Sequence, residues 1–151
     1  QRSAGFFTGM HAYHSSELLD TGSCVQLIDG VLSLVTTASS KVCSGIVNKV
    51  IECSEENPAR TSLGETLTSG YVVTVLSVGD SRHEECQGFN VCNENGDIQP
   101  GDLLVTSNTP GYLMKQDDDI IRSCTVGKAM EAVTFDENGQ ATGVYGYLYC
   151  G

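Results

Sequence analysis

Residues 101–131 decide the fold of this chain, and they read GDLLVTSNTPGYLMKQDDDIIRSCTVGKAME. The apolar runs in this stretch are short and are separated by turn residues. Thr109-Pro110-Gly111 predicts a tight turn, because proline fixes φ and glycine accepts a positive φ. Strands are expected around this turn and at the end of the stretch, at 103–105, 112–115 and 124–130. The stretch predicts a β module built on turns, without an obvious catalytic group.

The rest of the chain consists of similar short segments. Asp29-Gly30 is a strong hairpin signal. Helical periodicity is nearly absent, and residues 120–132 have room for one helical turn at most. Further strands are expected at 10–14, 24–28, 31–35, 42–52, 70–78, 89–92 and 143–149, with a polar loop at 53–68. We therefore predict an all-β fold, a compact β-sandwich or barrel-like domain of about ten short strands.

The chain also contains an internal similarity. Gly101 lies 79 positions after Gly22, and the segment 126–131 lies the same 79 positions after 47–52. This spacing predicts two related three-stranded units packed as a pseudo-symmetric pair, since neither unit alone has enough strands to bury a face. Chance similarity between hairpins is the alternative. The predicted organisation is an N-terminal connector or arm at 1–9 and a single β domain at 10–151, with the repeat-like units at 19–52 and 98–132.

Charge and composition exclude several classes of partner. The formal charge is −11, from 8 basic and 19 acidic residues, which argues against binding to nucleic acid or to an anionic membrane. No apolar run is long enough to cross a bilayer, and no signal-peptide pattern opens the sequence. We expect neither nucleic acid binding nor membrane insertion.

Seven cysteines are present, and no pair has the two-residue spacing of a zinc knuckle. Their odd number leaves at least one thiol unpaired within a single chain. Cys24, Cys43 and Cys124 lie inside apolar segments, where cysteine often serves as a small buried hydrophobic residue. Cys86 and Cys92 flank a predicted turn and are the best candidates for a local disulfide, although spacing alone cannot establish the required geometry.

Two clusters contain residue types that bind metals or act in catalysis in other proteins. His11, His14 and Glu17 would suit a metal on a helix, but residues three apart on a strand point to opposite faces. Asp80-Ser81-Arg82-His83-Glu84 contains a serine, a histidine and carboxylates, yet neighbours in sequence rarely fold into a catalytic triad. For both clusters the structural interpretation is favoured.

Two acidic turns, 93–97 and 117–119, resemble calcium loops in composition. Neither has the full twelve-residue pattern with a closing glutamate, so solvated turns are the favoured interpretation. The sequence thus predicts no catalytic, cofactor-binding or metal-binding residues and favours a non-enzymatic protein.

The segment 101–131 resembles a known family. The residues that carry the resemblance are Gly101–Ser107, Thr109–Lys115 and Val126–Glu131. Together they are similar to the C-terminal domain of phage and viral tail fibre or appendage proteins, of the preneck-appendage, intramolecular-chaperone (peptidase G2-like) type. The front part, from Gly5 to Gly30, and the strand at 45–47 are similar to the same domain, whereas 53–87 matches it poorly.

The resemblance implies a β-rich, typically trimeric domain at the end of a fibre. It leads to the hypothesis of a structural, self-assembling domain in a virion or extracellular filament, whose partner is a further copy of itself. Alternating tyrosines at 145, 147 and 149, with Phe6 and Phe7, would supply an apolar contact surface.

Two alternatives remain open. Some members of the family are chaperones that cut themselves off after trimerisation, and Glu17 or Asp20 would then be the residues to suspect. This sequence shows no clear self-cleavage motif. The other alternative is a fibre tip that recognises a host-surface glycan, which requires an exposed cleft of aromatic and carboxylate groups.

Overall fold

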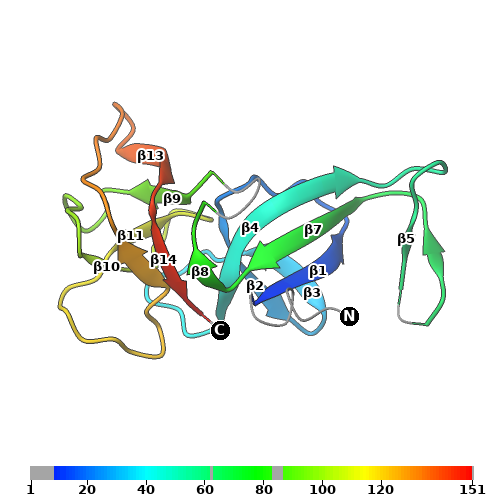
Figure 1. Cartoon of the computed structure of the whole chain (residues 1–151), viewed down its shortest axis with the longest axis horizontal. Coiled ribbons are helices and arrows are strands. Elements are labelled where there is room, and N and C mark those ends of the chain that lie inside the picture. Colours follow the sequence, from blue (N-terminus) through cyan, green and yellow to red (C-terminus); the bar gives the residue numbers. More distant parts are fainter. Residues whose placement is uncertain (1–8, 62, 83–86, 151) are drawn as a thin grey trace.

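The computed structural model describes residues 9–61, 63–82 and 87–150, and within these ranges the chain forms strands and turns without a helix (Figure 1). The all-β prediction is confirmed. No helix in the described residues is available to span a membrane. The described residues form 14 strands. They exceed the prediction because a short hairpin lies in the expected loop at 53–68, and because Ser77 and Tyr145 interrupt two expected strands.

The first sheet is antiparallel, with the order β1-β7-β4-β2-β3. Its strands are β1 (Met10–Ser15), β2 (Cys24–Ile28), β3 (Val31–Leu34), β4 (Cys43–Glu52) and β7 (Tyr71–Leu76). The edge strands β1 and β3 approach each other, so this sheet curls toward a half-barrel. Asp29 and Gly30 both have a positive φ, which confirms the predicted hairpin turn between β2 and β3.

The second sheet has the order β13-β9-β11-β10-β12-β14-β8. Its strands are β8 (Val78–Asp80), β9 (Phe89–Cys92), β10 (Leu103–Thr106), β11 (Leu113–Lys115), β12 (Gly127–Ala129), β13 (Gln140–Val144) and β14 (Gly146–Tyr149). All of its pairings are antiparallel except β9 with β11. The strands β7 and β8 are separated only by Ser77, so the same segment of chain enters both sheets.

The two predicted repeat units have the same strand order. In 19–52 the order is β3-β2-β4, and in 98–132 it is β11-β10-β12. The third strand of each unit then pairs with a later strand, β7 in the first sheet and β14 in the second. This correspondence is what a duplication would produce, and the duplication itself stays a prediction. The predicted connector 1–9 lies outside the described residues except for Gly9, whose carbonyl accepts a hydrogen bond from the Ser77 hydroxyl at 2.6 Å.

Part of each of the three central strands β2, β4 and β7 is buried on both faces, because successive side chains of a strand point in opposite directions. Val25, Val47 and Val75 belong to a core within the curled first sheet. Their direct neighbours Cys24, Ile46 and Leu76 belong to a second core, shared with Phe89, Leu104 and Leu148 of the other sheet. Each fully buried Val, Leu or Ile side chain contributes about 1.5–3 kcal/mol, so these strands connect the two cores energetically.

Phe89 is the largest fully buried side chain, and two glycines make room for its ring. A Cβ added at Gly146 would stand 2.7 Å from the Phe89 ring, and one at Gly127 would stand 3.0 Å from it. Either Cβ would also overlap a backbone carbonyl of the paired strand, that of Lys128 or of Tyr147. Bare backbone at these two positions is therefore a packing requirement of the second core.

A polar hairpin, β5 (Ala59–Arg60) with β6 (Thr66–Leu67), projects from the body at the end of the β4–β7 ribbon (Figure 1). The prediction of a loop at 53–68 was wrong on this point. Thr61 closes the turn: its amide donates to the Glu65 carbonyl at 3.0 Å, and its hydroxyl accepts from the Glu65 amide at 3.1 Å. Gly64, with φ +87°, supplies the turn geometry. We call residues 54–69 the arm.

Gly146→Ala is predicted to destabilise the domain by about 1–3 kcal/mol, because the new methyl group forces the Phe89 ring and the Lys128 backbone apart. Chemical denaturation followed by tyrosine fluorescence measures the change. Thr142→Ala, at an exposed position of the neighbouring β13, serves as the control and should shift stability by no more than about 0.5 kcal/mol. An unchanged midpoint for Gly146→Ala would contradict this account of the core.

Candidate functional site

A cleft of about 620 Å³ lies beside Arg82, where the chain leaves β8. Asp20, Arg82, Asn90 and Tyr112 are among the residues that line it. Its walls come from the loop before β2, from β9 and from the turn before β11, so the cleft forms only when both sheets are in place.

Arg82 is held in place by several partners. Its Nη2 donates to the Gly143 carbonyl at 2.6 Å and to Glu131 Oε2 at 3.1 Å. The guanidinium lies 5.3 Å from the centroid of the Tyr145 ring, within the range of a cation–π interaction. The Tyr145 amide donates to the same Glu131 oxygen at 3.2 Å, so one carboxylate connects the arginine to the start of β14.

Two tyrosines extend this cluster across the surface. The rings of Tyr145 and Tyr147 meet edge to face with centroids 5.8 Å apart, and their hydroxyl oxygens are 3.4 Å apart. The Tyr145 hydroxyl also donates to Asp80 Oδ2 at 3.4 Å. The hydrogen bond with Tyr147, then desolvation, then the negative charge of Asp80 raise the pKa of Tyr145 to about 12. At neutral pH this hydroxyl therefore stays a donor, and the cluster offers aromatic, cationic and anionic groups together.

In its described part, residues 80–82, the predicted serine–histidine cluster has a structural role. The Ser81 side chain is fully buried. Its hydroxyl accepts from the Gly146 amide at 2.9 Å and donates to the Val144 carbonyl at 3.3 Å, which ties β8 to the β13–β14 connection. His83 and Glu84 lie outside the described residues. The favoured structural interpretation of Ser81 agrees with these contacts.

The histidine cluster does not converge on a common point. The ring Nε2 of His14 is 2.7 Å from the Ser69 carbonyl, and Glu17 takes part in a local turn with Ser15 through its backbone. His11 is exposed on β1. Across the described ranges, no group of three or more histidine, cysteine or acidic side chains is arranged to hold a metal ion.

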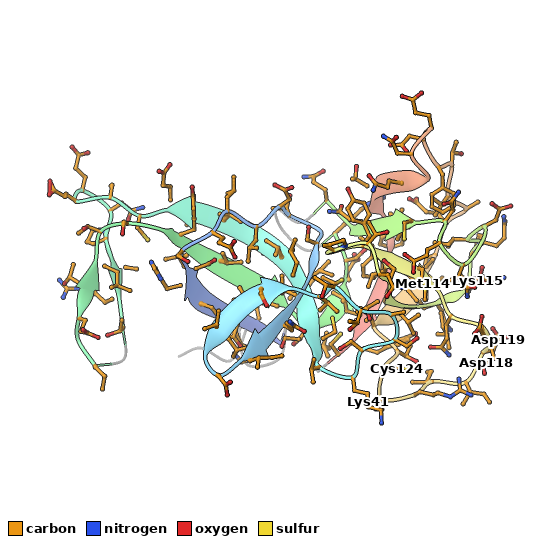
Figure 2. The ribbon with its side chains drawn as sticks, turned by 180° about the vertical axis from the view of Figure 1, so that it is seen from behind. Lys41, Met114, Lys115, Asp118, Asp119 and Cys124 are labelled. Carbon is orange, nitrogen blue, oxygen red and sulfur yellow. The ribbon has the colours of Figure 1, made fainter. Side chains whose placement is uncertain are left out.

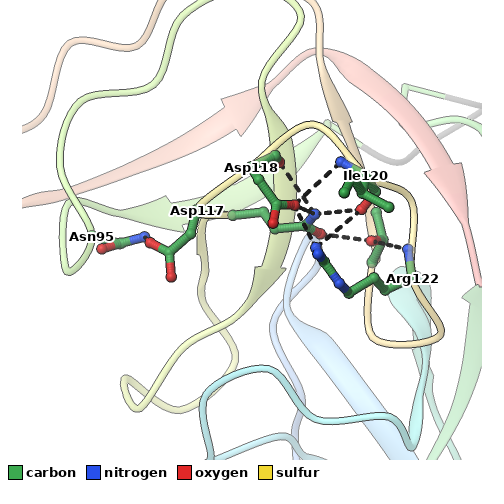
Figure 3. Close-up of polar contacts among 7 residues, drawn as sticks. Asn95, Asp117, Asp118, Ile120 and Arg122 are labelled. Carbon is green, nitrogen blue, oxygen red and sulfur yellow. Dashed lines mark hydrogen bonds and ion pairs between the residues drawn. The ribbon is translucent and has the colours of Figure 1, made fainter.

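The acidic corner 117–119 lies at the opposite end of the molecule from the arm (Figure 2). Figure 3 shows that the Asp118 carboxylate is occupied by protein donors. Its Oδ1 accepts from the Arg122 guanidinium, from the Ile120 amide at 3.2 Å and from the buried Gln116 side chain at 3.0 Å. The hydrogen bond from Arg122, followed by that from Ile120, holds the pKa of Asp118 well below its ordinary value.

The second acidic turn, 93–97, meets the first. Asn95 donates to Asp117 Oδ1 at 2.8 Å and to the Lys115 carbonyl at 2.9 Å. The Glu94 carboxylate accepts from the amide and the side chain of Asn108, at 3.1 and 2.9 Å. The two calcium-like segments are therefore joined by hydrogen bonds between protein groups, which agrees with their favoured interpretation as turns.

The remaining predicted residues are placed as follows. Tyr147 is 38% exposed, Tyr145 and Tyr149 are half-buried, and Phe6 and Phe7 lie outside the described residues. The Cys92 thiol is free and buried, and Cys86, the other member of the predicted disulfide, lies outside the described residues. Glu17 and Asp20 are both exposed, and only Asp20 reaches the cleft.

Comparison of this chain with protein-family models, with curated proteins and with solved structures found no match. The cluster of Arg82, Glu131 and Tyr145 was missed at the level of sequence, because its members are 49 and 14 positions apart and follow no motif.

Arg122→Gln is predicted to raise the pKa of Asp118 toward its ordinary value of 3.8, since the largest stabiliser of the carboxylate is lost. In the wild type the folded-state pKa lies below the unfolded one. The carboxylate's stabilising effect is therefore present above about pH 4 and is lost as the pH falls through the folded-state pKa. A carbon-detected NMR titration of the Asp118 carboxyl measures both values. Equal titration midpoints in wild type and variant would contradict the assignment, and Arg60→Gln on the distant arm is the control.

Proposed function

We propose that this chain is a self-associating structural domain of a virion tail fibre or a similar extracellular filament. The observation that carries the proposal is the arm, which projects from the body in Figure 1 and exposes the apolar side chain of Leu63. The resemblance of residues 101–131 to fibre-end domains supports it and favours a trimer as the assembled form.

The arm is a two-stranded hairpin with an exposed apolar residue at its tip. Leu63 at its tip is 86% exposed, the largest exposure among the large apolar side chains of the described residues. An isolated two-stranded hairpin is at best marginally stable in water, because it has no second layer on which to bury a face. Packing against a second copy of the chain would bury Leu63 and give the hairpin that layer.

The same molecule also has a groove in which such a tip can bind. Where the arm leaves the body, a groove of about 540 Å³ is lined by Tyr13, His14, Ala59, Leu67 and Val72, with further arm residues. A protein that presents both an arm and an apolar groove makes head-to-tail contacts, which close into a ring when the rotation between copies allows it. We therefore assign the groove to the arm of a neighbouring copy.

The charge of the chain sets a condition for assembly. Each copy carries a net charge of −11, and the arm contributes Glu55, Glu56 and Glu65 against a single basic residue, Arg60. Copies therefore repel one another at low ionic strength, and the favourable contribution must come from apolar burial. Since salt shortens the range of the repulsion to about 8 Å at 0.15 M, assembly should strengthen as salt is added.

Leu63→Asp is predicted to abolish self-association, because it places a charge at the tip that enters the apolar groove. Size-exclusion chromatography with light scattering measures the mass at 0.15 M salt and high protein concentration. Wild type should give a multiple of the 16.0 kDa chain mass, with three copies expected, whereas the variant should give one copy.

Val31→Asp is the matched control for this experiment. Val31 is also an exposed apolar residue, at 64%, but it is the first residue of β3, away from the arm. This variant should assemble as the wild type does. A wild-type protein that stays a monomer at high concentration would refute the proposal.

Glycan recognition is a second candidate, favoured by the cluster beside the cleft. Tyr145, Tyr147, Asp80 and Arg82 combine aromatic faces with charged hydrogen-bonding groups, which is the combination that sugar rings require. A glycan array on which the protein binds nothing would eliminate this candidate. Self-cleavage at Glu17 or Asp20 stays a prediction from the resemblance, since no contact of the described residues favours it.

A further inference from the structure

The groove at the base of the arm combines apolar walls with a positive charge. Tyr13, Leu67 and Val72 supply apolar surface, and Arg60 of β5 adds its guanidinium. Among the described residues that line this groove, Arg60 is the only one with a permanent charge, and none is a carboxylate. On a chain whose net charge is −11, the groove is therefore a local site of positive charge.

The Arg60 guanidinium has donors to spare. Arg60 is exposed, and its Nη1 is 3.5 Å from the hydroxyl of Thr66, the residue opposite it in the β5–β6 hairpin. None of the ion pairs between described residues includes Arg60. Because a guanidinium presents five N–H donors in a planar fork that matches a carboxylate, Arg60 can bind a carboxylate that enters the groove.

The tip of the arm carries the complementary groups. Leu63 exposes its apolar side chain, and Glu65, two residues later, is also exposed. Thr61 fixes the backbone of Glu65 on both sides, at 3.0 Å and 3.1 Å. The Glu65 carboxylate forms no ion pair with a described residue, and this includes Arg60 of the same hairpin. The tip therefore presents an apolar group and a negative charge on a fixed turn.

We propose that Glu65 of one copy pairs with Arg60 in the groove of a neighbouring copy, so that the arm selects its partner by charge as well as by apolar burial. This inference rests on the proposed self-association through the arm. Complementary charges contribute specificity more than affinity, so apolar burial of Leu63 remains the main source of binding free energy. A pair enclosed by the groove is also screened less by salt than the long-range repulsion between copies.

Charge reversal at the two positions tests the pair. Glu65→Arg brings two cations together in the contact, and Arg60→Glu brings two carboxylates together. Each variant should raise the apparent dissociation constant of self-association by about a hundredfold, because like charges then face each other at close range. Light scattering over a concentration series at 0.15 M salt measures this constant. The double variant, which exchanges the two charges, should assemble as the wild type does.

A mixture of the two single variants shows whether the pair forms between copies. In the mixture, the new cation at the tip of Glu65→Arg meets the new carboxylate in the groove of Arg60→Glu. The unchanged tip and the unchanged groove of the two variants match each other as in the wild type. Native mass spectrometry should therefore find assemblies that contain both variants, although each variant alone stays a monomer. A pair within one copy would be restored in the double variant but not in the mixture.

Two controls change the net charge by the same amount elsewhere. Glu55→Arg lies outside the tip of the arm, and Lys41→Glu lies on the part of the body away from the arm (Figure 2), so both should assemble as the wild type does. If the wild type assembles and Leu63→Asp does not, but the charge reversals have no effect or the mixture stays monomeric, the ion pair is overturned and self-association through the arm stands. A monomeric wild type would refute both.

Discussion

Burial of part of β2, β4 and β7 on both faces is the constraint on which the rest of the structure depends. Adjacent residues such as Ile46 and Val47 belong to different cores, so loss of these strands would disrupt both cores. The segment through Ser77 strengthens this dependence, because it continues from β7 of one sheet into β8 of the other. The arm extends from the outer ends of β4 and β7, and the cleft beside Arg82 also needs both sheets.

Much of this architecture could be predicted from sequence. Runs of β-branched residues and the Asp29-Gly30 turn locate strands by local chemistry, and local chemistry is what a sequence shows directly. The arm was missed because Thr61 and Gly64 give a weak turn signal inside a polar segment. The cluster around Arg82 could not be found this way, since long-range strand pairing brings its members together.

Self-association needs the arm to extend from a rigid ribbon. This demand is met if the two cores behave as one cooperative unit. The acidic corner is held together by contacts of its own, because Gln116 and Arg122 both donate hydrogen bonds to Asp118.

Native-state hydrogen exchange at increasing denaturant tests this cooperative unit most directly, because it reports the opening free energy of each strand separately. Amides of β7 in the first sheet and of β12 and β14 in the second should converge on a single unfolding isotherm. The arm amides should exchange through a separate opening of lower free energy. Two distinct isotherms for β7 and for β14 would show that the sheets unfold independently, and would contradict the account.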